Sequence, residues 1–258
     1  MNTFVENMKR HFNIDVSSFE IDSDMSNVIN MTIETYLPRG DDPQLELSKY
    51  HAPAANKSNI ITFFINSIDS ITYKDADHLM TSLDSFGRPY NLSLLYNCMD
   101  RLDWLRLFKE TWTMCDSCSL YHDNFRHILN QYTLDEIRTH IQNDDDRIMY
   151  DSLPDIVDIY RGTFVHDDFR HGLSWTTDIK VAEQFANGYK SFAEKGPMYF
   201  RYMCNMDLDT LNRLTDIASD GVVTLKGQID KSNIFVITNR GESEIIVLDT
   251  DYITYDNI

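Results

Sequence analysis

The hydrophobic pattern of the chain changes between its middle and its last hundred residues. In the middle, apolar side chains recur with helical spacing and fall on one face of a helix. These side chains are Tyr121, Phe125, Ile128, Leu129 and Tyr132. In the last hundred residues, short apolar runs alternate with turn residues, which is typical of β-strands. This change of period predicts an α+β protein in which a helical region precedes a β-rich region.

Several elements are predicted along the chain. Thr133 stands three residues before Glu136, the spacing of a capping box that opens a helix, and residues 142–147 read as the polar turn that ends it. Residues 27–36 alternate between apolar and polar, and residues 59–66 are almost continuously apolar, so we predict a strand at each place. The later apolar runs are predicted strands of a mixed sheet: DIYRG (158–162), GLSWTT (172–177), MYFRYMC (198–204), NIFVIT (233–238) and EIIVL (244–248).

The composition restricts the classes of partner. The net charge is −18 and the isoelectric point is near 4.6, which argues against direct binding to nucleic-acid phosphates. The same charge favours attraction to basic or arginine-bearing protein surfaces. The sequence contains neither a signal-peptide pattern nor an apolar stretch of about 18 residues, the length that a membrane span requires. We therefore expect no membrane association.

The cysteines indicate the compartment and a weak metal pattern. Four cysteines are too few for a disulfide scaffold in 258 residues, so we expect a reducing cytoplasm. The segment CDSC (115–118) with His122 and His127 contains zinc-ligand types. However, the stretch is part of an amphipathic helical pattern, whereas tetrahedral zinc usually needs a turn between its cysteines. We expect core or surface cysteines there and no metal.

The segment GLSWTTDIKVAEQFA (172–186) reads as a strand that runs directly into a helix. Side chains alternate along a strand, so Ser174 and Thr176 share one face while Trp175 points to the other, toward the core. Asp178 suits the N-cap of the helix. Two hydroxyls are therefore presented together at the end of a buried strand.

Two further segments place charge at strand ends. Arg161 lies at the end of a predicted strand and its guanidinium fork suits phosphate and ribose oxygens, while Gly162 allows close backbone approach. Glu242 and Glu244 are two residues apart, so we expect them on the same side of a strand. Such a pair of carboxylates is tolerated on an exposed edge, and it also suits a place where a cation must be bound.

Together and in chain order, these segments resemble a known enzyme family. Tyr160-Arg161-Gly162, then SWTTDIKVAEQFA with its Ala182, Phe185 and Ala186 spacing, then Glu242-Ser243-Glu244 resemble the arginine, serine, glutamate signature of the ADP-ribosyltransferase family. The closest similarity is to the arginine-directed branch found in bacterial toxins and phage enzymes, and it covers residues 159–248. The resemblance implies a split mixed β-sheet core preceded by a helical lobe.

The resemblance also implies a domain organisation and a role for each site residue. Residues 91–258 are expected to form the catalytic domain, with a helical lobe over 91–158 and an NAD-binding core over 159–258, while residues 1–90 form an α+β region of unknown role. Glu244 would stabilise oxocarbenium charge on the ribose, and Glu242 would orient the acceptor guanidinium. The residues expected to bind NAD, which is the substrate, are Arg161, Gly162, Ser174 and Thr176, with Ser174 also holding Glu244.

The expected activity is therefore mono-ADP-ribosylation of a target protein on arginine, in the cytoplasm, or in the host cytoplasm if the gene belongs to a phage. Two alternatives remain open. An NAD glycohydrolase would use water as the acceptor. A non-enzymatic acidic protein, for example a mimic of nucleic acid, would use the −18 charge and leave both glutamates as surface acids.

Overall fold

The computed structural model describes residues 2–12, 14–19, 58, 60–83, 85, 87–115, 121–165, 171–195, 220–238 and 241–257. The chain divides into two compact units: the first holds the described residues up to Tyr121, and the second those from His122 onward. The boundary expected after residue 90 falls inside a helix, Arg88–Leu95, of the first unit. The strands predicted over 27–36 and 198–204 lie outside the described residues.

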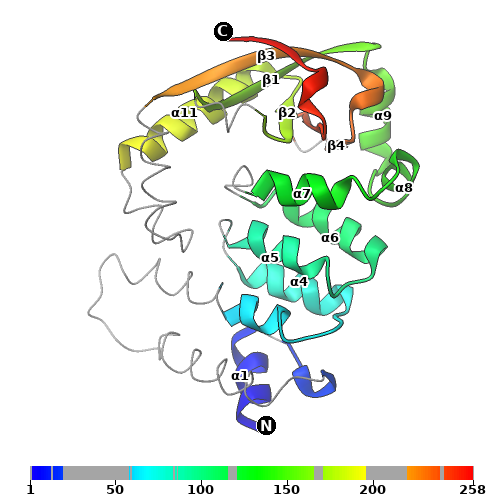
Figure 1. Ribbon diagram of the computed structural model, residues 1–258, viewed down its shortest axis with the longest axis vertical. Coiled ribbons are helices and arrows are strands. Elements are labelled where there is room, and N and C mark those ends of the chain that lie inside the picture. Colours follow the sequence, from blue (N-terminus) through cyan, green and yellow to red (C-terminus); the bar gives the residue numbers. More distant parts are fainter. Residues whose placement is uncertain are drawn as a thin grey trace. The chain divides into compact units, whose positions relative to one another are not determined.

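The described part of the first unit is helical (Figure 1). Its elements are α1 (Asn2–Phe12), the 3₁₀ turn η1 (Val16–Ser18), α4 (Tyr73–Ser82), α5 (Arg88–Leu95) and α6 (Arg101–Trp112). Helix α6 packs against α4 and α5. The Trp104 ring is fully buried, stacks on Phe108 with 5.4 Å between ring centroids, and donates from its indole nitrogen to the Leu92 carbonyl at 2.8 Å. Aromatic packing on α6 is thus the centre of this unit.

The strand predicted over residues 59–66 is wrong, because residues 60–65 are helical. Ile60, Ile61, Phe64 and Ile65 are all buried, and their spacing places them on one helical face. The Thr62 hydroxyl donates to the carbonyl of Ser58 four residues earlier at 3.0 Å, a bond that is typical of threonine in a helix. A short apolar run does not distinguish a buried strand from a buried helix by periodicity alone.

The described part of the second unit combines helices with a six-stranded sheet. Its helices are α7 (His122–Leu129), α8 (Leu134–His140), α9 (Asp144–Ser152) and α11 (Ile179–Lys195). Its strands are β1 (Ile156–Phe164), β2 (Ser174–Thr176), β3 (Val222–Asp230), β4 (Val236–Thr238), β5 (Glu244–Ile246) and β6 (Thr254–Asn257), with 3₁₀ turns η3 (Lys231–Asn233) and η4 (Thr250–Tyr252). The protein is therefore α+β, as the change of period predicts. Within the described residues, no helix is both long enough and apolar enough to cross a membrane.

The sheet has the strand order β4-β5-β2-β1-β3-β6. Every pairing between described strands is antiparallel, so the expectation of a mixed sheet is not met there. Strand β1 pairs with β3 along its whole length, but with β2 only through Tyr160 and Thr176. The sheet thus consists of two halves, β1-β3-β6 and β2-β5-β4, that meet at a short junction. Ser174 and Arg161 lie next to that junction.

The sequence predictions for residues 121–147 are confirmed in part. Phe125, Ile128, Leu129 and Tyr132 are buried, and Thr133 forms the predicted capping box with Glu136. The polar turn predicted to end this helix over residues 142–147 is confirmed only as far as Asn143, because α8 ends at His140 and α9 begins at Asp144. Asn143 is its N-cap and forms a second capping box with Asp146, so the acidic run stabilises the first turn of a helix.

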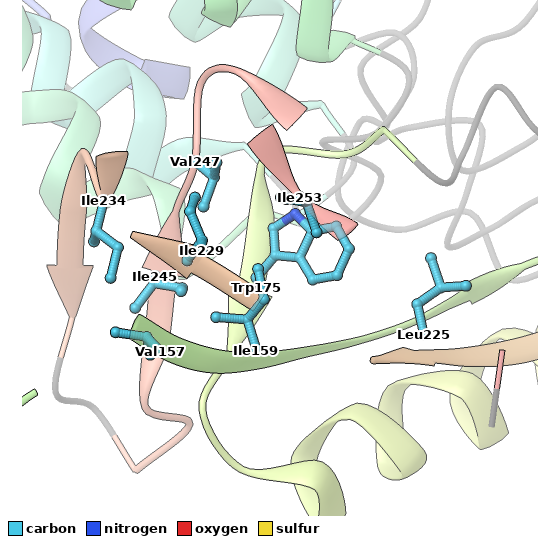
Figure 2. Close-up of a cluster of buried hydrophobic side chains, with 9 residues drawn as sticks. All are labelled: Val157, Ile159, Trp175, Leu225, Ile229, Ile234, Ile245, Val247 and Ile253. Atoms are coloured by element: carbon cyan, nitrogen blue, oxygen red, sulfur yellow. The ribbon is translucent and has the colours of Figure 1, made fainter. Parts of the chain in front are cut away.

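The core of the second unit lies between the two halves of the sheet. Figure 2 shows the nine side chains of this cluster: Val157, Ile159, Trp175, Leu225, Ile229, Ile234, Ile245, Val247 and Ile253. Trp175 is 1% exposed, and its indole nitrogen donates to the Gly172 carbonyl at 2.9 Å. The prediction that Trp175 points into the core, away from Ser174, is therefore confirmed. Burial of Trp175 fixes which face of β2 carries the hydroxyls.

Helix α11 packs on β1 and β3 and meets β1 at Gly162 (Figure 1). A Cβ atom at Gly162 would lie 2.0 Å from the Ala182 carbonyl oxygen and 2.4 Å from the Ala186 nitrogen. Ala182 and Ala186 are buried in this contact, whereas Phe185, which we grouped with them, is 48% exposed. Glycine at position 162 therefore serves the contact between helix and strand.

Because that contact has no room for a methyl group, we expect Gly162→Ala to lower the free energy of unfolding by about 1–3 kcal/mol, the usual cost of overpacking. Gly188→Ala is the control, on the helix that packs against Gly162, because a Cβ atom at Gly188 meets nothing within 4 Å. That control should raise stability slightly, by up to about 1 kcal/mol, since alanine favours a helix over glycine. Urea unfolding of both variants checks the pair. Equal stability of the two would contradict the close packing of α11 on β1.

Candidate functional site

The Glu244 carboxylate lies at the start of β5, between the two neighbouring strands. Its register partners are Thr176 on β2 and Thr238 on β4. The Ser174 hydroxyl donates to Oε1 of Glu244 at 2.5 Å, and the Thr238 hydroxyl donates to Oε2 at 3.1 Å. Glu244 is 8% exposed, so these bonds offset much of the cost of burying a carboxylate. The result is a buried acid with a hydroxyl donor on each oxygen.

Arg161 reaches the same cluster through the backbone. Its Nη1 donates to the Ser174 carbonyl oxygen at 2.5 Å, and the residue is 8% exposed. Thus Ser174 contacts Arg161 through its main chain and Glu244 through its side chain. The three residues that the sequence singles out are brought together by hydrogen bonds.

Arg161 does not lie at the end of its strand as predicted, because β1 continues to Phe164. Tyr160 pairs with Thr176, so Arg161, the next residue, leaves β1 on the other side, which is the side of Ile159 and the core. Arg161 and Ser174 therefore point to opposite faces of the sheet. Nevertheless, the long arginine side chain extends to the end of β2 and bonds to its backbone, which strand alternation does not prevent.

Gly172 makes room for the Arg161 guanidinium. A Cβ atom at Gly172 would lie 2.1 Å from Nη2 of Arg161 and 2.3 Å from its central carbon. A side chain at this position would displace the guanidinium group. Gly172 was not among the predicted site residues, although it lies only two residues before Ser174 in the same segment.

Glu242 and Glu244 do not share a strand face, so that prediction is wrong. Strand β5 begins at Glu244, and Ser243 between the two glutamates has a φ of 46°. This left-handed conformation costs a serine of order 1–3 kcal/mol and turns the chain out of the extended form. Gly241, with a φ of 84°, completes the turn. Glu242 is exposed, whereas Glu244 is buried.

The turn is held by the residues that follow Trp175. The Thr176 hydroxyl donates to the Glu242 carbonyl at 2.6 Å and accepts from the Asp178 amide at 3.1 Å, and the Thr177 amide donates to the Ser243 carbonyl at 3.2 Å. Thr176 is buried, and both of these hydroxyl bonds go to backbone. In this structure, Thr176 therefore fixes the loop that carries Glu242. Asp178 caps α11 as predicted, accepting from the Lys180 amide at 2.9 Å.

The Glu242 carboxyl has a perturbed pKa. Although the Glu242 residue is exposed, nearby protein atoms exclude part of the water from its carboxyl. This desolvation raises the pKa above the usual value for glutamate, and the negative charge of Glu244 raises it further. The charged form of Glu242 therefore gains from any cation that binds beside the two carboxylates. A raised pKa of this kind, next to a second acid, is common at functional sites and also occurs in structural clusters.

Arg126 on α7 ties together the two chain segments that flank the site. Its Nε donates to the Leu248 carbonyl at 2.7 Å, beyond β5, and its Nη2 donates to the His171 carbonyl at 2.9 Å, before β2. The Val247 amide donates to the Leu173 carbonyl at 2.9 Å in the same region. Sequence reasoning did not find Arg126, because nothing local to α7 marks a contact with residues so distant in the chain.

The metal prediction can be examined only in part. Among the residues that the structure describes, no group of three or more histidine, cysteine or acidic side chains is placed to hold a metal ion. Cys118, the second cysteine of CDSC, lies outside the described residues. His171 is described, and its Nδ1 lies 3.1 Å from the Thr250 hydroxyl.

No protein-family model matches the chain, and neither the curated proteins nor the solved structures give a match.

Proposed function

We propose that this protein is a mono-ADP-ribosyltransferase that cleaves NAD and transfers ADP-ribose to a protein, with arginine as the acceptor. The observation that carries the proposal is the contact of Ser174 with both Glu244 and Arg161, at 2.5 Å each. These three residues come from separate segments of the sequence and follow one another in the order of the family signature. In the fold they are joined by hydrogen bonds. The two-part sheet with α11 packed on it is compatible with the same family, and the assignment to that fold is part of the proposal.

Glu244 is suited to the bond-breaking step. When the bond between nicotinamide and the ribose C1′ breaks, nicotinamide leaves with the bonding electron pair and positive charge develops on the ribose ring. A carboxylate that is already oriented by Ser174 and Thr238 can stabilise that charge without reorganising. The stabilisation is greater in the transition state than in the ground state, which is the condition for catalysis.

Glu242 is suited to the acceptor. A guanidinium is protonated at neutral pH and becomes a nucleophile only when a base takes up a proton as its nitrogen bonds to C1′. Glu242 is exposed on a turn beside Glu244, and the pKa of its carboxyl is raised, which makes it a better proton acceptor than an ordinary glutamate. This position supports arginine over an acceptor that carries no charge. The −18 net charge would attract basic target proteins.

Arg161 is proposed to anchor NAD through phosphate or ribose oxygens while it also holds the Ser174 backbone. A guanidinium has five N–H donors and can bond several groups at once; one of its bonds in Arg161 goes to the Ser174 carbonyl. Ser174 is proposed to act on Glu244 rather than on NAD alone. We expected Thr176 and Gly162 to bind NAD, but we now propose structural roles for both. Thr176 holds the turn that carries Glu242, and Gly162 allows α11 to pack closely on β1.

We expect Arg161→Ala to weaken NAD binding about ten- to a hundredfold, since a charge-assisted contact contributes about 1.5–3 kcal/mol. Titration calorimetry on the folded variant measures this. Arg147→Ala is the control, because Arg147 is exposed on α9 in the same unit; it forms a weak ion pair with Asp144 at 3.7 Å and donates to the Arg138 carbonyl at 3.2 Å, both on the surface. Unchanged affinity in Arg161→Ala would confine Arg161 to holding Ser174.

A single incubation separates the proposed function from its two alternatives. The purified protein is mixed with NAD labelled in its adenylate phosphate and with a cell lysate. Label on protein, resistant to denaturation, is the expected result. Free ADP-ribose without labelled protein would identify an NAD glycohydrolase, a second candidate because the Glu244 cluster alone could serve cleavage with water as acceptor. If the NAD stays intact, the non-enzymatic acidic interaction protein would be the alternative that remains.

A further inference from the structure

Thr238 is a third hydroxyl at the site, and it comes from the strand on the other side of Glu244. It is the last residue of β4 and is 3% exposed. Its register partner on β5 is Glu244, and its hydroxyl donates to Oε2 at 3.1 Å. Ser174 approaches from β2 and donates to the other oxygen, Oε1. The carboxylate is thus held from both neighbouring strands.

Two hydrogen-bond donors on separate carboxylate oxygens restrain the orientation of the Glu244 carboxylate more than one donor does. The last torsion of a glutamate side chain joins a tetrahedral carbon to a planar carboxyl group, and such torsions have broad minima. One hydrogen bond restrains one oxygen and leaves the plane of the carboxylate free to tilt. A second bond on the other oxygen fixes the plane. Because Glu244 is buried, each bond is also worth more than it would be in water.

We infer that Thr238 is a positioning residue for Glu244: it fixes the plane of the carboxylate, together with Ser174, and so sets which direction the acid presents to the reacting ribose. This role rests on the proposed function for its catalytic consequence, but the contact itself does not. Thr238 acts through Glu244 and needs no contact with NAD. Its loss should therefore change the rate of the chemical step more than the binding of substrate.

The test uses three variants of the full chain. Thr238→Val keeps the shape of the side chain and removes the donor, whereas Thr238→Ser keeps the donor. Thr250→Val is the matched control, because Thr250 is also a buried threonine of the second unit, with its hydroxyl within 3.1 Å of His171 rather than near Glu244. We expect Thr238→Val to lower kcat for nicotinamide release about ten- to a hundredfold, the range for a hydrogen bond to a charged group. KM for NAD should stay within about twofold.

Thr238→Ser should restore most of kcat, and Thr250→Val should leave it unchanged. A merely structural role for Thr238 would not give this division between kcat and KM, nor rescue by serine. If Thr238→Val retains the wild-type kcat while Glu244→Gln loses activity, the inference is overturned.

A second measurement does not depend on the enzyme activity. Urea midpoints are compared for Thr238→Val, Glu244→Ala and the double variant. We expect Thr238→Val to lower the midpoint of the wild-type chain and to lower it less, or not at all, once Glu244 is alanine. Equal shifts in both backgrounds would overturn the contact. If the wild type itself releases no nicotinamide, the proposed function fails, and this cycle alone decides whether Thr238 holds Glu244.

Discussion

Glu244→Gln should lower both ADP-ribose transfer and NAD hydrolysis by several hundredfold. Glutamine has nearly the same shape, but its single carbonyl oxygen can accept only one of the two hydroxyls, which donate to different oxygens of Glu244; the other hydroxyl then faces the amide NH2 group. It lacks the negative charge that opposes the positive charge on the ribose. Removal of one preorganised electrostatic group typically costs about 3–4 kcal/mol in the transition state, which corresponds to this loss.

The measurement is nicotinamide release by the purified variant, with and without an arginine-bearing acceptor. Glu183→Gln is the control, because it makes the same chemical change on the exposed surface of α11. The control should retain wild-type rates. Full activity in Glu244→Gln, with the variant folded as judged by thermal unfolding, would show that the family resemblance is misleading.

Glu242→Ala should separate transfer from hydrolysis. Glu242 lies on the Gly241–Ser243 turn and is exposed, while Glu244 keeps its contacts on the adjoining strand. The substitution leaves the ribose chemistry intact and removes the partner of the acceptor guanidinium. We therefore expect labelling of protein to fall by a hundredfold or more, in line with the ~10²–10⁴-fold that general base catalysis contributes. Slow hydrolysis to ADP-ribose and nicotinamide should persist.

The pH dependence of the wild type offers a check on the same residue. Partial desolvation raises the pKa of Glu242, and the Glu244 charge raises it further. The protonated form of Glu242 is therefore favoured, so transfer should increase as the pH rises through a value above the usual glutamate pKa. Hydrolysis of NAD should not show this increase with pH.

Normal protein labelling by Glu242→Ala would mean that arginine is not the acceptor.

Local sequence pattern predicted the features that depend on neighbouring residues alone. Strand alternation placed Trp175 in the core and left Ser174 on the opposite face, and the Thr133–Glu136 spacing predicted a helix start. Both outcomes depend on residues within one turn or one strand. The contact of Ser174 with Glu244 was expected only through the family resemblance.

The parts that were missed depend on contacts between distant segments. Strand β3 is an exception that was missed for a local reason: Val223, Leu225 and Ile229 alternate with polar residues, but Gly227 stands where the pattern calls for another apolar side chain. The separation of Glu242 from Glu244 follows from the positive φ of Ser243, a conformation that serine rarely adopts and that no neighbouring residue announces. Thr238 meets Glu244 only because β4 and β5 pair in one particular register.

The most direct test of the central claim is proton NMR of NAD incubated with the purified protein, which detects free nicotinamide without assuming any acceptor. The wild type should release nicotinamide, Glu244→Gln should release it several hundredfold more slowly, and Glu242→Ala should remain close to the wild type. This order would place cleavage of the glycosidic bond at the Ser174–Glu244 cluster. NAD that stays intact with the folded wild-type protein, or that is consumed equally by all three proteins, would contradict the account.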